Sequence, residues 1–399
     1  MPTTDELLAR LGTKRPPAPK EFVVAANGDV RQAGSDPPSE SQPWLKDFVL
    51  AAEQSLYIFA KSILGLSLLT RALHLPLCNW LQQCPPYRKL YMLPRDCLKT
   101  SIARSLAIHI LIQCKLRNIY IKGKHGPDTR ILYAGEIIDN AMAQMGWIMD
   151  QYTNNKRLRA LWPHLMWDNP LHDSKQWSTK GMIVRRGPKH GGDMDYPEPS
   201  IRPIGVGGAI AGYHGDVQLK DDLVTLNAAN SPTMMETAKE WHKASRPLFD
   251  DPDTGLEFIL GTHWAIGDLY DEIKKDPSVE CVVRAAVEDG IPIFPERLPI
   301  PVLNQLKQEL GTLFPLLYMN CANDPTLVDF DASQLRFYHM KGTSLVLTPD
   351  SRDILLAERQ ATTPQTFLPP STDDSDRGKP LAEVYDKFHA RDRYLRFHS

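Results

Sequence analysis

A lysine followed by two hydroxyl residues, Lys99-Thr100-Ser101, is the part of this sequence best suited to chemistry. It follows an apolar stretch, residues 89–93, after a short turn, and it opens an apolar segment, residues 102–108, that we expect to be helical. A strand, a loop and a helix in this order form an anion site, because the first backbone N–H groups of the helix point at the ligand. In such a site the lysine reaches the outer phosphates of a nucleotide and the hydroxyl binds Mg²⁺. The stretch therefore predicts a phosphate-binding loop.

The loop departs from the usual pattern G-x-x-x-x-G-K-[ST], because Leu93 and Leu98 stand at the two glycine positions. Arg95 lies inside the loop, and its guanidinium is a bidentate donor for phosphate oxygens. The alternative is a buried strand joined to an amphipathic helix, with the ammonium group of Lys99 reaching solvent. These residues alone leave both interpretations open.

Length and composition are those of a soluble globular protein of one large domain or two ordinary ones: 399 residues, 42% hydrophobic and 24% charged. The net charge of −2 means that any contact with nucleic acid must rest on a local basic patch. The six cysteines form no CxxC pair, which favours reduced thiols in the cytosol. The N-terminus lacks a signal region, and the most apolar run, residues 48–69, is interrupted by charged residues, so we expect no membrane segment.

Alternating strand and helix patterns predict an α/β fold with a mostly parallel sheet flanked by helices. We expect a flexible N-terminal arm over 1–43 with one helical turn at 6–11, a globular domain over 44–325, and a linker or the truncated start of another domain over 326–399. The expected helices are 44–72, 77–82 (after a break at His74-Leu75-Pro76) and 137–152, and the further strands are 129–134, 217–224 and 257–260. Ligands of such sheets bind at the carboxyl ends of the strands.

Two adjacent carboxylates, Asp221-Asp222, lie in the predicted strand 217–224. In an ATPase the first would hold Mg²⁺ and the second would orient or deprotonate the attacking water. Gln218 and Lys220 interrupt the apolar run of this strand, and adjacent aspartates are also common in solvated turns.

A third strand, 257–260, ends in Gly261-Thr262. A threonine beside the terminal phosphate can sense whether that phosphate is present. The alternative is an ordinary Gly-Thr turn.

The order of these motifs resembles the ATPase part of large terminase subunits, the DNA-packaging motors of tailed phages, over residues 44–325. The residues that carry the resemblance are Pro94 to Ser101, Leu132-Tyr133-Ala134-Gly135-Glu136, Gly212 to Gly215 with Asp221 to Val224, Gly261 to Trp264 with Asp268 to Tyr270, and Phe294 to Arg297 with Leu310-Gly311 and Tyr318-Met319-Asn320.

The resemblance implies a P-loop NTPase fold of the additional-strand class and a Mg²⁺-dependent ATPase that translocates double-stranded viral DNA into the procapsid. The implied nucleotide contacts are Pro94, Arg95, Asp96, Cys97, Leu98, Lys99, Thr100 and Ser101. Lys99 would bind the β- and γ-phosphates, Arg95 would stabilise charge on them, and Thr262 would couple hydrolysis to motion. Thr100 (or Ser101) and Asp221 would ligate Mg²⁺, and Asp222 would be the catalytic carboxylate, although the family commonly has glutamate there. An adenine contact is expected within residues 74–82.

The implied partners are double-stranded DNA, a portal protein, a small terminase subunit and further copies of the chain in a ring. The implied location is the host cytoplasm, transiently at the procapsid portal. Large terminase subunits usually carry a ribonuclease-H-like nuclease as well. Residues 344–350, with Asp350 and nearby Asp353, would be its first strand and acids, but about seventy residues after the ATPase match are too few for that fold, so we expect a hairpin or linker and no nuclease activity.

Two other functions stay open: a helicase-like translocase, and a degenerate relative that serves as a docking or scaffold protein. The basic segment 180–190 either contacts DNA phosphates or forms a solvated turn. His214, His242 and His263 lack the spacing of zinc ligands and are interpreted as structural. Trp162, Trp167 and Trp177 either pack in the core or stack on bases.

Overall fold

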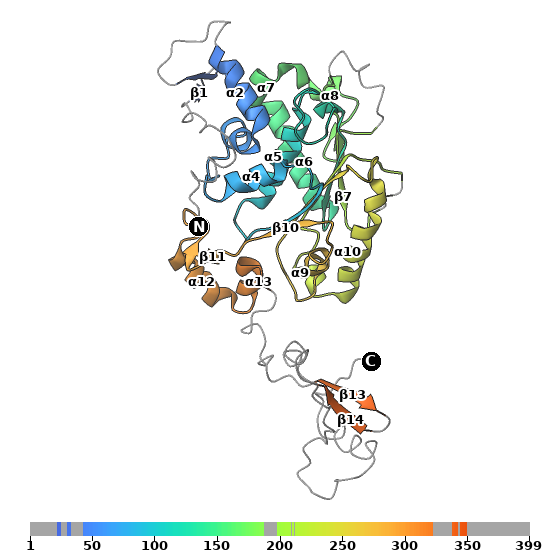
Figure 1. Cartoon of the computed structure of the whole chain (residues 1–399). Coiled ribbons are helices and arrows are strands. Elements are labelled where there is room, and N and C mark those ends of the chain that lie inside the picture. The colour runs from blue at the N-terminus through green and yellow to red at the C-terminus, as the bar shows by residue number, and fades with distance from the viewer. Residues whose placement is uncertain are drawn as a thin grey trace, which may run out of the picture. The chain divides into compact units, whose positions relative to one another are not determined.

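The computed structural model describes residues 22–24, 30–32, 43–186, 198–208, 210, 212–321, 337–341 and 344–348, and the chain divides into two units, Met1–Asn323 and Asp324–Ser399 (Figure 1). In the second unit, β13 (Phe337–Lys341) pairs with β14 (Ser344–Thr348) in an antiparallel hairpin. This hairpin contains most of the stretch that was considered as a nuclease strand. The predicted helical turn at 6–11 and the acids Asp350 and Asp353 lie outside the described residues.

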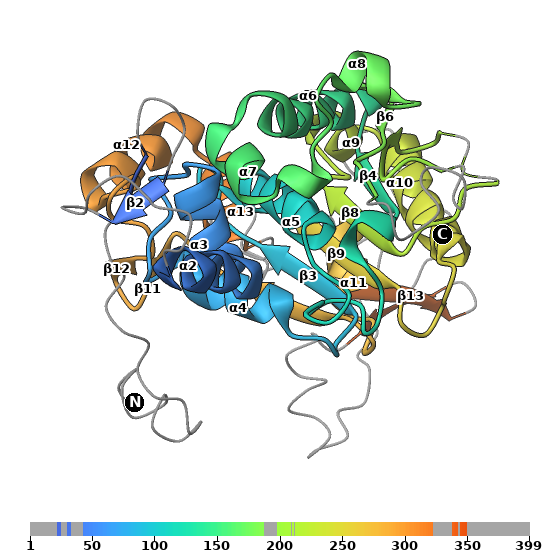
Figure 2. The ribbon, with the colours of Figure 1, turned by 90° about the horizontal axis from the view of Figure 1, so that it is seen from above.

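The first unit is built on an eight-stranded sheet whose first six strands are parallel. In spatial order the strands are β10 (Glu280–Val283), β3 (Arg88–Met92), β9 (Leu256–Gly261), β8 (Val217–Asp221), β4 (Ile131–Gly135), β7 (Ile201–Gly205), β6 (Gly181–Met182) and β5 (Trp177–Ser178). One strand, β9, lies between β3, which leads into the lysine loop, and β8, which ends in the acidic pair (Figure 2). This arrangement confirms the predicted α/β fold of the additional-strand class.

The two faces of the sheet follow the two-residue alternation of strands. Tyr91 and Phe258 belong to the larger core, which includes α4 (His74–Gln82), α5 (Lys99–Leu111) and α6 (Ile138–Asn154). The residues beside them in sequence, such as Leu90 and Ile259, belong to a second core formed with α10 (Pro232–Ala244) and α11 (Leu269–Ile273). The sheet is thus covered on both sides. Within the described residues no helix combines the length and the apolar character that a membrane span requires.

The remaining elements are shorter or lie at the periphery. They are β1 (Phe22–Val24), β2 (Val30–Gln32), α2 (Pro43–Gln54), α3 (Leu56–Ile58), the π-helix η1 (Phe59–Ile63), η2 (Gly126–Asp128), α7 (Lys156–Leu161), η3 (Pro163–Leu165), α8 (Pro170–Asp173), α9 (Leu226–Ala229), η6 (Arg246–Leu248), β11 (Val287–Glu288), β12 (Ile291–Pro292), α12 (Ile300–Leu310) and α13 (Leu313–Met319).

Two predictions about the N-terminal helices were wrong. The helix expected over 44–72 ends at Ile63 and is divided near Ser55, whose hydroxyl accepts a hydrogen bond from the backbone N–H of Ile58 (3.3 Å) and so caps a new helix. The expected break at His74-Leu75-Pro76 is instead the first turn of α4. Proline is tolerated there because the N–H groups of a first turn have no partner within the helix.

The polar residues that interrupt the apolar run of β8 form a buried ionic network. The ammonium group of Lys220 donates to Ser245 Oγ (2.7 Å) and to the carboxylate of Glu257, which also accepts from Arg88 Nε (2.6 Å). Burial opposes ionisation of Glu257, but the neighbouring positive charges prevail and lower its pKa to about 2. Gln218 donates to the backbone carbonyl of Ser245 (2.7 Å). Lys220 and the amide nitrogen of Gln218 therefore both have buried partners.

Replacing Lys220 with Met should destabilise the protein by about 3–5 kcal/mol, because it leaves the carboxylate of Glu257 buried without its closest cation. Chemical denaturation of Lys220→Met measures this loss. The double variant Lys220→Met/Glu257→Met should recover much of the stability, because both charges are then removed together. If the stability of Lys220→Met lay within 1 kcal/mol of the parent, Lys220 would not be the cation that stabilises the buried carboxylate of Glu257.

Candidate functional site

The loop between β3 and α5 has the backbone shape that glycine normally provides. Asp96 (φ 67°) and Leu98 (φ 61°) both adopt left-handed conformations, which cost a residue with a Cβ roughly 1–2 kcal/mol. Leu98 occupies the second glycine position of the usual pattern, and its side chain packs against the larger core, which offsets the strain. Leu93, at the first glycine position, is buried. The loop keeps its shape without glycine because packing holds it.

The loop is also fixed from α4 and β3. The imidazole of His74 hydrogen-bonds to the carbonyl of Cys97 through Nε2 (3.4 Å) and accepts from the backbone N–H of Thr70 at Nδ1 (2.9 Å). The hydroxyl of Tyr91 donates to the carbonyl of Lys99 (3.2 Å). His74 is fully buried, and burial lowers its pKa to about 4. The segment 74–82, expected to hold adenine, thus contributes a support for the phosphate loop.

The neutrality of His74 predicts a loss of stability in mild acid. The unfolded chain binds a proton at this residue below about pH 6.5, whereas the folded chain binds it only near pH 4. The contribution is therefore complete above pH 6.5 and is lost as the pH falls toward 4, by about 3 kcal/mol in total. Denaturation curves between pH 7 and 4.5 should show a shallower pH dependence for His74→Gln than for the parent. Parallel curves would contradict this assignment.

Three predicted site residues from three separate segments meet at the carboxyl edge of the sheet. The ammonium group of Lys99, at the start of α5, donates a hydrogen bond to the hydroxyl of Thr262, just after β9. The same group lies 3.6 Å from Oδ1 of Asp222, just after β8. The side chain of Lys99 is 9% exposed. The cation that would bind phosphate is thus held by the groups that would act on its terminal phosphate.

Beside this cluster, Asp221 and Thr100 form the predicted metal-binding pair. The hydroxyl of Thr100 donates to Oδ1 of Asp221 (3.2 Å), and the hydroxyl of Tyr133 donates to Oδ2 (2.9 Å). Burial and the negative charge of Asp222 raise the pKa of Asp221 to about 7. A cation bound beside this buried carboxylate would favour its ionised form. A hydroxyl and a carboxylate are also hard oxygen ligands of the kind Mg²⁺ prefers, so the pair fits this ion.

Asp222 has a backbone conformation that favours aspartate over glutamate. Its φ is 48°, a left-handed conformation in which Asp and Asn are several-fold enriched among non-glycine residues. Its N–H donates to the carbonyl of Leu260 (3.0 Å), and its own carbonyl accepts from the N–H of Glu136 (3.2 Å). Its Oδ1 atom is buried and accepts no hydrogen bond, and the charged group facing it is the ammonium group of Lys99, 3.6 Å away. The predicted strand 217–224 ends early because of this turn.

Arg95 lies at the exposed rim of the site. Its guanidinium carbon is 5.1 Å from the ring centroid of Trp264, and its backbone N–H donates to the carbonyl of Leu317 (2.9 Å). The next residue, Asp96, pairs with Arg297 (3.2 Å). The structure therefore groups Lys99, Thr262 and Asp222 closely and places Arg95 against the segment that follows Thr262.

Three side chains near the site have no role in the sequence-based prediction. Tyr133 reaches Asp221 because β4 and β8 are neighbours and Tyr133 pairs with Leu219, two residues before the aspartate. Glu136, just after β4, accepts from the hydroxyl of Thr225. Arg104, one turn into α5, donates to Ser101 Oγ (3.1 Å), the residue considered as a substitute for Thr100. Of these, only Tyr133 and Glu136 lie in a quoted motif, and no local signal marks their partners.

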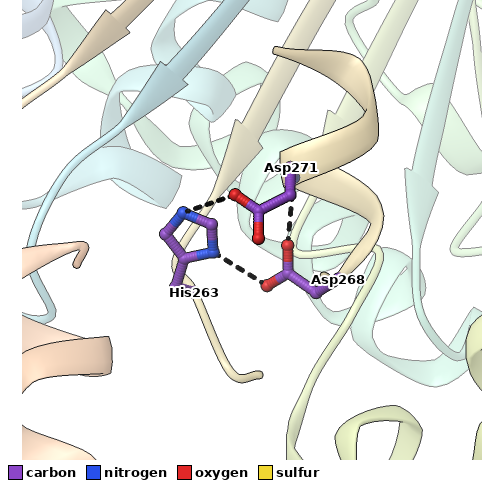
Figure 3. A group of neighbouring side chains, drawn as sticks. All are labelled: His263, Asp268 and Asp271. Carbon is purple, nitrogen blue, oxygen red and sulfur yellow. Dashed lines mark hydrogen bonds and ion pairs between the residues drawn. The ribbon is translucent and has the colours of Figure 1, made fainter. Parts of the chain in front are cut away.

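His263, the residue after Thr262, is held at the start of α11 by polar contacts with two aspartates (Figure 3). Its Nδ1 lies 3.0 Å from Asp268 and its Nε2 lies 3.7 Å from Asp271. The ammonium group of Lys274 lies 2.9 Å from Nε2. Asp268 also caps α11 by accepting from the N–H of Tyr270 (2.9 Å). These side chains offer metal ligands close together. The ammonium group beside Nε2 disfavours a metal cation at this position, so we interpret the cluster as a structural contact that holds the end of β9 against α11.

Comparisons with known proteins show a similarity to solved structures. No family model and no curated protein matches the sequence. Among solved structures, the chain is similar to an arginine-to-alanine mutant of the large terminase ATPase domain of Thermus phage P74-26, with 12% sequence identity and a TM-score of 0.36. The match covers 58% of this chain and 87% of that one. The roles assigned to individual residues rest on their own geometry.

Proposed function

We propose that this chain binds ATP with Mg²⁺ at the carboxyl edge of its sheet and hydrolyses it. The observation that carries the proposal is the convergence of Lys99, Thr262 and Asp222 beside the Thr100–Asp221 pair. These residues come from three segments spread over more than 160 positions of the chain. A cation, a hydroxyl, two carboxylates and a helix N-terminus are the groups that phosphoryl transfer to water requires.

Each group has a role that follows from its position. Lys99 exchanges Thr262 and Asp222 for phosphate oxygens when a nucleotide binds. Thr100 and Asp221 are the residues that would hold Mg²⁺, which neutralises charge on the phosphates. Asp222, whose Oδ1 accepts no hydrogen bond, orients the attacking water and takes its proton. Thr262, released by Lys99, is placed to sense the terminal phosphate.

We propose further that hydrolysis drives translocation of double-stranded DNA, as in the packaging of viral genomes. The motif order that resembles large terminase subunits supports this function, and it implies a ring of copies on a portal in the host cytoplasm, with a small subunit that selects the DNA. Local charge also supports it: residues 155–186 contain seven lysines and arginines against two aspartates, in a chain of net charge −2. Lys180, in the β5–β6 connection, and Arg185, just beyond β6, are exposed.

Double-stranded DNA should stimulate ATP hydrolysis, and Lys180→Glu/Arg185→Glu should lower the stimulated rate several-fold while leaving the basal rate unchanged. The reason is that β5 and β6 lie toward the opposite end of the sheet from β3, which leads to Lys99, and that duplex binding is mainly electrostatic. Phosphate release is measured with and without DNA over a range of salt concentrations, and Lys307→Glu on α12 is the matched exposed control. A basal rate that DNA does not change would remove the support for translocation and leave only the ATPase.

A further inference from the structure

The last turn of α13 contacts several parts of the site at once. The carbonyl of Leu317 accepts from the N–H of Arg95 in the phosphate loop (2.9 Å). The carbonyl of Tyr318 accepts from the N–H of Ala286, shortly after β10 (2.7 Å). Two consecutive residues at one helix end therefore contact segments that are far apart in sequence. None of these contacts is needed to build the sheet.

Asn320, which ends this helix, makes the contact closest to the chemistry. Its backbone is left-handed (φ 46°) and the residue is 6% exposed. Its Oδ1 accepts from the backbone N–H of His263 (3.4 Å), and its Nδ2 donates to the carbonyl of Arg284 (2.9 Å). One amide thus connects the end of β9 to the segment that follows β10. Only a side chain with both a donor and an acceptor can do this.

We propose that Asn320 is a positioning residue that holds Thr262, and through it Lys99, in place for the terminal phosphate of ATP. This inference rests on the proposed function. The N–H that Asn320 binds belongs to the peptide group joining Thr262 to His263, so this hydrogen bond restrains the backbone that carries the side chain of Thr262. The imidazole of the same histidine is held on its other side by Asp268 and α11. The residue that follows Thr262 is therefore held by α11 through its imidazole and by Asn320 through its backbone N–H.

The position of Thr262 matters only when a terminal phosphate is present. Its hydroxyl is the partner that Lys99 gives up on nucleotide binding. ADP lacks the group that this pair would contact. A displaced Thr262 should consequently weaken the preference of the site for ATP over ADP and slow hydrolysis, while binding of ADP is preserved. A purely structural role for Asn320 would weaken binding of both nucleotides equally.

Two substitutions separate the amide from the backbone. Asn320→Gly keeps the left-handed conformation without strain and removes the side chain. Asn320→Asp keeps the acceptor for His263 and places a carboxylate oxygen against the carbonyl of Arg284.

Asp289→Gly is the control, since this exposed residue is also left-handed (φ 51°) and lies in the turn between β11 and β12. Misplacement of a reacting group by about 1 Å can cost on the order of 100-fold in rate.

The experiment measures kcat together with Kd for ADP and for a non-hydrolysable ATP analogue. For both Asn320 variants we expect kcat to fall by about 10- to 100-fold, Kd for ADP to stay within about twofold, and the preference for the ATP analogue to be lost. Asp289→Gly should match the parent. Parent-like kcat and nucleotide preference in both variants, or equal losses for both nucleotides, would overturn the positioning role while leaving the ATPase intact. A parent chain that binds no ATP would overturn the proposed function and this inference together.

Discussion

Replacing Lys99 with Ala should lower the rate of ATP hydrolysis by about 10³-fold or more, because the site loses the cation that meets the charge on the transferred phosphate. Lys99 is nearly buried, and its ammonium group already lies against Thr262 and Asp222. Fold and stability should change little, because the side chain of Asp222 is 36% exposed and can be solvated once its partner is gone. Phosphate release under saturating ATP and Mg²⁺ gives the rate.

Two further variants show whether charge or shape matters at this position. Lys99→Met keeps the apolar stem and should be as inactive as Lys99→Ala. Lys307→Ala, an exposed lysine on α12, should be fully active. Equal rates for the parent and Lys99→Ala would mean that the glycine-free loop binds no phosphate, and the alternative of a docking or scaffold protein would then be preferred.

The second large effect is expected at Asp222. Asp222→Asn should lower kcat by about 10²- to 10⁴-fold, the range for loss of a general base, while ATP still binds. Asparagine is the appropriate substitute because it tolerates the left-handed backbone (φ 48°) as well as aspartate does. Single-turnover hydrolysis and ATP binding, measured side by side, separate chemistry from affinity.

Asp222→Glu tests whether the shorter acid is required by the backbone. Glutamate is disfavoured in the left-handed region, so this variant should be both less stable and less active than the parent. Should Asp222→Asn hydrolyse ATP at the parental rate, the catalytic base is another group. Glu136, whose N–H contacts the carbonyl of Asp222, would be the next residue to examine.

The local parts of the site were predictable from the sequence. Lys99-Thr100, Asp221-Asp222 and Thr262 each follow an apolar strand, and parallel strands end at the same edge of a sheet. Once the α/β fold class had been predicted, it followed that these residues meet at one edge of the sheet. The conformation of Leu98 was not predictable, because left-handed backbone at leucine depends on packing against residues distant in sequence.

Contacts that depend on strand order or on long-range packing were missed. Tyr133 reaches Asp221 only because β4 lies next to β8. Lys220 interrupts an apolar run and resembles a solvent-facing residue until Glu257 on β9 is placed beside it. Asn320 lies 57 residues from His263, whose backbone it binds. In each case the partner belongs to another element, and periodicity within one segment carries no information about it.

The most direct test of the proposed nucleotide site is a calorimetric titration of the chain with ATP in the presence and absence of Mg²⁺, with Lys99→Ala as comparison. We predict one saturable site per chain, with tighter binding in the presence of Mg²⁺ because Thr100 and Asp221 then hold the ion, and with much weaker binding in Lys99→Ala. Absence of saturable binding, or binding that the loss of Lys99 does not change, would contradict the assignment of this loop as a nucleotide site.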